Sequence, residues 1–217
     1  MYLSRIKLDT QKRATMIALS NPQRFHGAIE NALGVDNERS RTLWRLDTLN
    51  GEPCLIILTR NIPTLSSVAD QFAIDANAVE TKGYDALLDH IVPGSQWHFR
   101  LTANPTKGQK SSTIHESRGK VTALISVPQQ EEWLLKRAEA YGFSLQPEAF
   151  GVTQSHTYEF QKLGKQKVTI LSVDFEGILT VLDAERFRQT MINGIGRGKA
   201  YGNGLLTIMR AQGAKNG

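Results

Sequence analysis

The sequence has almost no cysteine, because Cys54 is the only one among 217 residues. A disulfide framework and a cysteine-based zinc site are therefore excluded, and a single thiol fits a reducing compartment. No apolar run approaches the roughly 18 residues that a transmembrane helix needs. Residues 1–7 also lack the hydrophobic core of a signal peptide. We therefore expect a cytoplasmic protein with no membrane partner.

Clusters of metal ligands are absent from the sequence as well. Four of the five histidines, His90, His98, His115 and His156, are scattered without His-x-x-x-His spacing, and the carboxylates form no close pair. This pattern disfavours a metal or other cofactor, including the paired ions of a two-metal nuclease. RNA can nevertheless be cut without a metal, because its own 2′-hydroxyl attacks the adjacent phosphate once a base removes the proton. A histidine suits that role.

Acidic residues are missing where basic residues concentrate. The chain carries a net charge of +5 and has a pI near 9.4. The tract 100–120 holds five basic residues against one acid, and the tract from 186 to the end holds six basic residues and no acid. Lys162, Lys165 and Lys167 form a third group. Such concentration of like charge predicts a polyanionic partner such as nucleic acid.

The order of predicted elements repeats once along the chain. Hydrophobic alternation and helical spacing give strand, helix, strand, strand, helix, strand in each half. This βαββαβ duplication predicts an α+β protein with tandem ferredoxin-like (RRM-like) units at 1–103 and 120–217, joined by a basic linker at 104–119. The first unit takes strands at 2–8, 42–49, 53–60 and 95–103 and helices at 21–33 and 64–72; the second takes strands at 120–127, 157–161, 168–182 and 205–210 and helices at 129–141 and 184–193. The aromatic RNP1 pattern of an ordinary RRM is absent.

The helix predicted at 21–33 carries the histidine of greatest interest. Asn21 is a favoured cap and Pro22 suits the first helical position, while Phe25 and Ile29 begin an apolar stripe. His26 follows Phe25 by one residue, about 100° around the helix, so we expect it beside the buried stripe. From the pattern alone the histidine is either structural or reachable by a ligand.

The segment 194–204 contains five glycines in eleven positions. A dinucleotide-binding fingerprint needs a strand before the glycines and a helix after them, and here the predicted order is reversed. The phosphate-binding loop ending in Gly-Lys-Ser/Thr also fails, because Ala200 follows Lys199. Two interpretations remain open: an RNA-backbone contact helped by Arg197 and Lys199, or a structural helix cap and turn.

A series of short motifs, taken in order, resembles one known family. They are Met1–Ser4, His26, Phe99–Leu101, Ala103–Lys107, Trp133, Gly142–Phe143, Phe175–Thr180 and the segment 194–205. The chain is similar over nearly its whole length to CasE, the repeat-processing endoribonuclease family of subtype I-E CRISPR systems. The resemblance implies two ferredoxin-like domains in tandem, in agreement with the element order.

The resemblance also implies an activity. A CasE protein cuts CRISPR precursor RNA within each repeat, at the 3′ base of the hairpin, without metal and by attack of a 2′-hydroxyl. The products carry 5′-hydroxyl and 2′,3′-cyclic phosphate ends, and the enzyme stays on the mature crRNA as a subunit of the Cascade complex. His26 occupies the catalytic position, with Gln23, Arg24 and Lys107 as possible support. Some members have a tyrosine and a lysine where this chain has Gln23 and Asn31.

RNA contacts are expected in three basic segments. They comprise Lys110, Arg118 and Lys120; Lys162, Lys165 and Lys167; and Gly196, Arg197, Gly198 and Lys199. Because the major groove of an RNA stem is narrow, recognition should rest mostly on shape and phosphate contacts. We expect the isolated chain to be a monomer. The alternative function is a subunit of the same fold that binds the RNA hairpin without cutting it.

Overall fold

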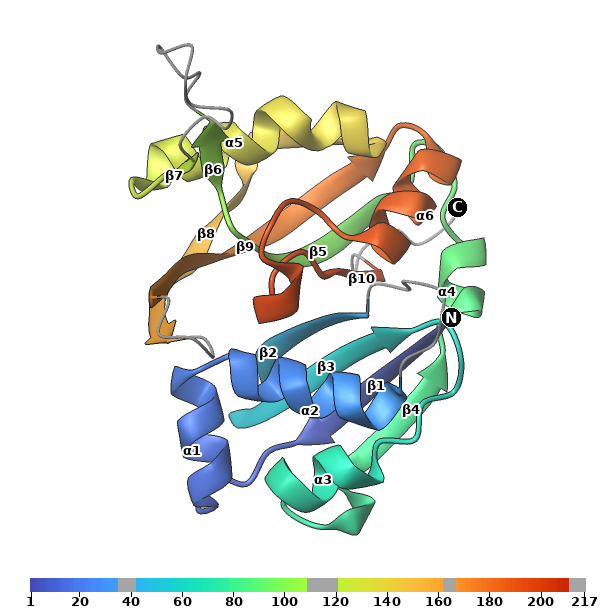
Figure 1. The fold of residues 1–217 in the computed structure, drawn as a ribbon. Helices are drawn as coiled ribbons and strands as arrows, with labels where there is room; N and C mark the ends of the chain where they lie inside the picture. The colour runs from blue at the N-terminus through green and yellow to red at the C-terminus, as the bar shows by residue number, and fades with distance from the viewer. Residues whose placement is uncertain (35–41, 109–120, 162–166, 211–217) are drawn as a thin grey trace.

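A computed structural model describes residues 1–34, 42–108, 121–161 and 167–210. It contains two four-stranded antiparallel sheets that lie between two sets of helices (Figure 1). The first sheet has the order β2 (Leu43–Leu49), β3 (Glu52–Thr59), β1 (Tyr2–Lys7) and β4 (Val79–Gly83). The second has the order β10 (Leu206–Arg210), β5 (Gln96–Ala103), β9 (Lys167–Val181) and β8 (Phe143–Gln161). In each sheet the first strand of the unit lies between the third and the fourth, so the same plan occurs twice. The predicted α+β duplication is confirmed.

Helices cover the outer face of each sheet. In the first unit these are α1 (Arg13–Ser20), α2 (Gln23–Leu33), α3 (Ser66–Phe72) and the short turn η1 (Ala76–Ala78). In the second unit they are α5 (Val127–Ala138), η2 (Glu139–Tyr141) and α6 (Ala184–Asn193), and α4 (Asp85–Asp89) lies between the two sheets in the chain. No helix in the described ranges is long and apolar enough to cross a membrane.

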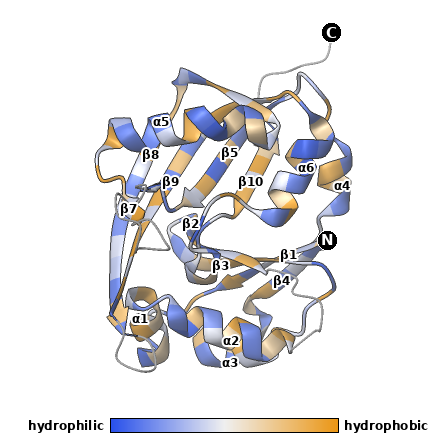
Figure 2. Ribbon diagram, turned by 45° about the horizontal axis from the view of Figure 1, so that its top comes forward, coloured by the Kyte–Doolittle hydropathy of each residue, from blue (hydrophilic) through white to orange (hydrophobic). Residues whose placement is uncertain are grey.

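The central strand β3 is buried on both faces. Leu55 and Ile57 belong to the core under the helices of the first unit, whereas Ile56 and Leu58 join the core of the second. Hydrophobic and hydrophilic residues alternate along β5 and β9, as Figure 2 shows. One continuous hydrophobic cluster therefore bridges the two units, and each unit rests on the other.

The predicted assignment of strand 95–103 to the first unit is wrong. The segment forms β5, but β5 pairs with β9 and β10 of the second sheet. The fourth strand of the first sheet is β4, which sequence inspection missed because its residues are mostly exposed and lack apolar alternation. Alternation of Trp97 and Phe99 identifies a strand with one buried face but not the partner strands.

The predicted linker at 104–119 is also not a simple connection between sheets. Its start, β6 (Thr106–Gly108), pairs with β7 (Val121–Ala123), and the residues between them lie outside the described ranges. The chain passes from one sheet to the other between β4 and β5 instead. The long strand β8 begins earlier than predicted, with an irregular register between Leu145 and Phe150.

A buried ion network joins the two sheets. Arg45 of β2 is 3% exposed; its Nη1 donates to the carbonyl oxygens of Arg100 (3.0 Å) and Leu205 (3.2 Å), and its Nη2 to Asp47 Oδ2 (2.7 Å). Asp47 also pairs with Arg100 Nη1 at 2.8 Å, and Arg100 Nη2 lies 3.1 Å from Asp174 Oδ2. Burial lowers the pKa of the Arg45 guanidinium, and the charge and hydrogen bond of Asp47 oppose that shift.

We predict that Asp47→Asn destabilises the protein strongly. The amide keeps the shape of the side chain but leaves Arg45 buried without its counter-ion, an arrangement that costs about 3–5 kcal/mol. Urea denaturation of both proteins measures the loss. The matched control is Glu80→Gln, which removes the exposed partner of Arg5 and should change the midpoint little. Equal effects of the two substitutions would show that the network does not hold the units together.

Candidate active site

The helix α2 places His26 at the surface beside the core. Asn21 Oδ1 accepts a hydrogen bond from the Gln23 amide (3.2 Å), which satisfies one free donor of the first turn. Phe25 and Ile29 are buried, and the Phe25 ring lies 5.9 Å from that of Trp44. His26 itself is 29% exposed. The prediction that His26 lies beside the apolar stripe and not within it is confirmed.

A surface pocket of about 380 Å³ brings His26 to the glycine-rich segment. His26 and Glu30 line it from α2, Thr42 lines it just before β2, and residues 196–200 close the other side. His26 and Arg197 lie far apart in the sequence and belong to different units. The packing of the two units therefore creates this pocket.

The glycine-rich segment packs against three successive residues of β2. A Cβ atom on Gly194 (φ +72°) would lie 2.8 Å from Leu43 Cδ2, and one on Gly202 (φ +80°) would lie 2.9 Å from Trp44 Cζ3. Arg45 binds the carbonyl of Leu205 at the end of the segment. Side chains at the two glycine positions would push the segment away from β2, and hence from His26.

The two cations of the segment differ in their surroundings. Lys199 Nζ donates to the carbonyl of Asn193 (2.5 Å), where α6 ends. Arg197 is exposed, and its backbone forms a bridge with Asn104. The interpretation as a helix end and turn is therefore confirmed, and the segment also places the exposed Arg197 in the lining of the pocket of His26, while the RNA contact stays a prediction.

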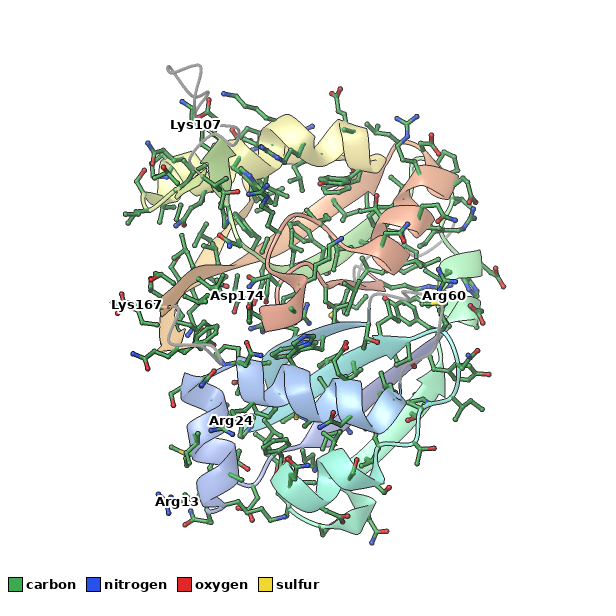
Figure 3. The ribbon with its side chains drawn as sticks, in the orientation of Figure 1. Arg13, Arg24, Arg60, Lys107, Lys167 and Asp174 are labelled. Atoms are coloured by element: carbon green, nitrogen blue, oxygen red, sulfur yellow. The ribbon has the colours of Figure 1, made fainter. Side chains whose placement is uncertain are left out.

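The structure does not bring the other predicted support residues into this pocket. Gln23 is half-buried, and its Oε1 is buried without a hydrogen-bond partner. Arg24 and Lys107 are exposed, and Figure 3 places Arg24 beside the helices of the first unit and Lys107 at the opposite end of the molecule. Asn31 is exposed near the end of α2.

The predicted RNA-binding lysines are described only in part. Lys167 begins β9 and pairs with Glu159 across the β8–β9 hairpin (2.8 Å), at the edge of the molecule in Figure 3. Lys110, Arg118, Lys120, Lys162 and Lys165 lie outside the described residues. Among the described members of the three predicted groups, Gly196 to Lys199 line the pocket of His26 and Lys167 does not.

Sequence analysis missed two residues of the pocket. Glu30 follows His26 by one helical turn, and its Oε1 lies 4.0 Å from His26 Nδ1. The i,i+4 spacing was the available signal, because residues so spaced share a helix face. Thr42 gave no comparable signal. Among the described residues, no three His, Cys, Asp or Glu side chains group as metal ligands.

Comparison with known proteins identifies the family. The profile of the family described as CRISPR associated protein matches residues 1–210. The CRISPR-associated endoribonuclease Cse3 of Thermus thermophilus is 31% identical over 221 residues, which cover 96% of this chain and 99% of that protein. This chain belongs to the CRISPR-associated Cse3 (CasE) family. The resemblance drawn from the short motifs is confirmed.

Solved structures agree with this Cse3 assignment. A structure of Cse3 bound to a 19-nucleotide RNA matches with a TM-score of 0.79 at 30% identity, over 96% of this chain and 100% of that one. A chain from a CRISPR RNA-guided surveillance complex matches with a TM-score of 0.72 at 23% identity, over 97% and 100%. The second likeness shows the fold alone.

We predict that Gly202→Ala is far more destabilising than Gly51→Ala. Both glycines have a φ near +80°, but a Cβ on Gly51 meets nothing within 4 Å, whereas one on Gly202 meets the buried Trp44 ring. The backbone cost alone is about 1–2 kcal/mol, and overpacking raises the loss at Gly202 to about 2–5 kcal/mol. Urea denaturation of the two variants measures the difference. Equal losses would mean that the segment is not seated on β2.

Proposed function

We propose that this chain is a metal-independent endoribonuclease that cuts CRISPR precursor RNA within its repeats. The cut falls at the 3′ base of the repeat hairpin and yields mature crRNA. The single observation that carries the proposal is that the half-buried His26 and the exposed Arg197 line the same pocket. The relative Cse3, which is named an endoribonuclease and has been solved with RNA, supports it.

The proposed reaction begins at the ribose next to the scissile phosphate. The His26 imidazole takes the proton of the 2′-hydroxyl, and the resulting oxyanion attacks the phosphorus. The bond between phosphorus and the 5′-oxygen breaks, and that oxygen takes a proton from the solvent that reaches this surface pocket. The products are a 2′,3′-cyclic phosphate and a 5′-hydroxyl. Glu30 Oε1 lies 4.0 Å from His26 Nδ1, on the same face of α2.

Arg197 supplies the positive charge that the reaction needs. Negative charge accumulates on the phosphoryl oxygens as the 2′-oxygen attacks, and a fixed cation beside them lowers the barrier. Lys199 is partly committed to the end of α6, so Arg197 is the better candidate. This assignment replaces Lys107, which lies at the opposite end of the molecule.

We further propose that the RNA stem contacts Lys167 and the glycine-rich segment. Shape and phosphate contacts would dominate binding, with a steep dependence on salt. The enzyme then stays on its product as a Cascade subunit, which fits the shared fold of a surveillance-complex chain. We place the protein in the cytoplasm, as a monomer when isolated.

The alternative is a subunit that binds the hairpin without cutting it. Gln23 favours this alternative, since a glutamine cannot act as an acid or base and its Oε1 is buried. Cleavage of the cognate repeat RNA by the purified protein in EDTA separates the two functions. Formation of a 2′,3′-cyclic phosphate product supports the enzyme, and binding without any product supports the alternative.

We predict that His26→Ala lowers the cleavage rate at least about 10²-fold, because the 2′-hydroxyl loses its general base. Binding of a repeat RNA blocked by a 2′-deoxy group at the cut should change little, since the stem contacts lie elsewhere. Single-turnover cleavage in EDTA and equilibrium binding measure the two effects.

The matched control for this prediction is His98→Ala, which removes an exposed histidine on β5. It should cut at the wild-type rate. Undiminished cleavage by the His26→Ala protein would remove the catalytic assignment. Equal loss in both variants would point to a general loss of folding, which thermal denaturation detects.

We predict that Arg197→Gln lowers the single-turnover rate about 10²–10³-fold at saturating protein, as expected for the loss of a group that stabilises an oxyanion. The comparison variant is Arg24→Gln, which removes an exposed cation of the same helix as His26 but outside the pocket. It should change the rate little. A reversed ranking of the two variants would assign the stabilising charge to Arg24.

A further inference from the structure

A second pocket, of about 280 Å³, lies between the two units. Pro22 lines it at the start of α2, Trp44 lines it from β2, and Tyr158 and Ser172 line it from β8 and β9. Tyr201, in the short turn η3 (Lys199–Tyr201), closes it on the side of the glycine-rich segment. Asp174 also lines the pocket, and Figure 3 shows this residue between the two units.

Buried polar groups in this pocket have no partner. Trp44 is 1% exposed and Ser172 9%, and the Trp44 Nε1 and Ser172 Oγ atoms are both buried without a hydrogen bond. Arg100 also lines the pocket, and its Nε atom is likewise buried without a hydrogen bond. Buried donors and acceptors are nearly always paired in folded proteins. These atoms therefore mark a place where a polar ligand completes the structure.

The carboxylates of the pocket disfavour a phosphate. Asp47 and Asp174 both line it and both pair with Arg100, which also lines it, and Asp47 is paired with Arg45 as well. Asp174 accepts hydrogen bonds from Thr102 Oγ1 (2.5 Å) and Arg100 Nη2 (3.1 Å), so about two of its four acceptor positions stay available. The ligand should thus offer hydrogen-bond donors to the Asp174 carboxylate.

Aromatic side chains of the pocket also restrict the shape of the ligand. The half-buried Tyr158 and Tyr201 both line the pocket, and aromatic surfaces favour a flat, apolar-faced group. Burial raises the pKa of Tyr158, with a smaller contribution from Asp174, so its hydroxyl stays protonated at neutral pH. A nucleobase has the required shape, and its edge carries donors and acceptors side by side.

The position of this pocket points to the RNA strand that is cut. Pro22 lines one pocket and His26 the other, four residues and about 6 Å apart along α2. The turn η3 separates them: Ala200 lines the pocket of His26, and Tyr201 lines the second pocket. A nucleotide next to the scissile phosphate can therefore reach the second pocket.

We propose that the second pocket holds one unstacked nucleobase of the RNA strand beside the cleavage site. The pocket prefers a base with an exocyclic amino group, as in adenine, cytosine or guanine, over uracil, because only such a base donates to Asp174 through an amine. This inference rests on the proposed function, since it requires RNA in the pocket of His26.

The test is an abasic scan of the repeat RNA. Each RNA carries a 2′-deoxy group that blocks the cut and one abasic nucleotide near the cleavage site. We expect one abasic position to weaken binding by the wild-type protein about tenfold, as for the loss of one stacked base. Ser172→Leu, which fills the pocket, should bind the intact RNA about tenfold more weakly and lose nothing further with that abasic RNA.

Ser172→Ala accompanies the filled variant, because it removes only the hydroxyl and adds no volume. It should bind the intact RNA more weakly than wild type, and thermal denaturation reports whether each variant is folded. Uracil at the sensitive position should bind more weakly than cytosine. An unchanged affinity of folded Ser172→Leu protein, or an abasic effect of the same size in it as in wild type, would overturn the proposal.

Two further outcomes are distinguishable. Weaker co-purification of Ser172→Leu with other Cascade subunits, together with unchanged RNA binding, would assign the pocket to a protein partner and overturn the base site. Cleavage of unmodified RNA by the wild-type protein is measured in parallel. Failure there would contradict the proposed function, whereas normal cleavage without an abasic effect would contradict only the base pocket.

Discussion

The seating of the glycine-rich segment on β2 is the constraint on which the rest of the structure depends. Leu43, Trp44 and Arg45 contact this segment in turn, through two close backbone approaches and one hydrogen bond. A buried guanidinium is seldom a net source of stability, because desolvation offsets its attraction to a carboxylate. A shift of the units would nevertheless separate Arg45 from the carbonyl oxygens of Arg100 and Leu205, and Asp47 from the Arg100 guanidinium. The network therefore selects one arrangement of the units, and that arrangement places Arg197 beside His26.

The residues of the glycine-rich segment fall into two kinds: some pack against the rest of the protein, and one cation is exposed. Gly194 and Gly202 let the backbone lie against the first unit, and Lys199 contacts the end of α6. These contacts hold the segment in place, while Arg197 remains exposed. A rigid backbone with one presented cation suits transition-state stabilisation, because a fixed charge pays no reorganisation when the reaction occurs. The same turn, η3, faces the second pocket through Tyr201.

Local patterns predicted the elements of this fold but not their neighbours. Asn21 and Pro22, followed by the apolar stripe, identified α2 and the side of it on which His26 lies. Alternation along residues 97–101 identified a strand, yet it specifies a buried face and not a partner, so β5 was given to the wrong sheet. The exposed β4 left no pattern to find. His26 and Arg197 lie far apart in the sequence, and only packing between the units brings them to one pocket. The family resemblance implied a role for His26, but it did not place Arg197 in the same pocket.

The two pockets on either side of η3 have opposite electrostatic character, and this contrast fixes how a nucleotide strand can lie across them. The pocket of His26 presents a guanidinium at its rim, which attracts a phosphate. The second presents two carboxylates, which repel a phosphate and accept hydrogen bonds from the edge of a base. A strand lying the other way round would put its backbone against Asp47 and Asp174. On the proposed function, the contrast admits a strand with its scissile phosphate at His26 and a neighbouring base between the units, so the joint between the units would both form the first pocket and orient the RNA across it.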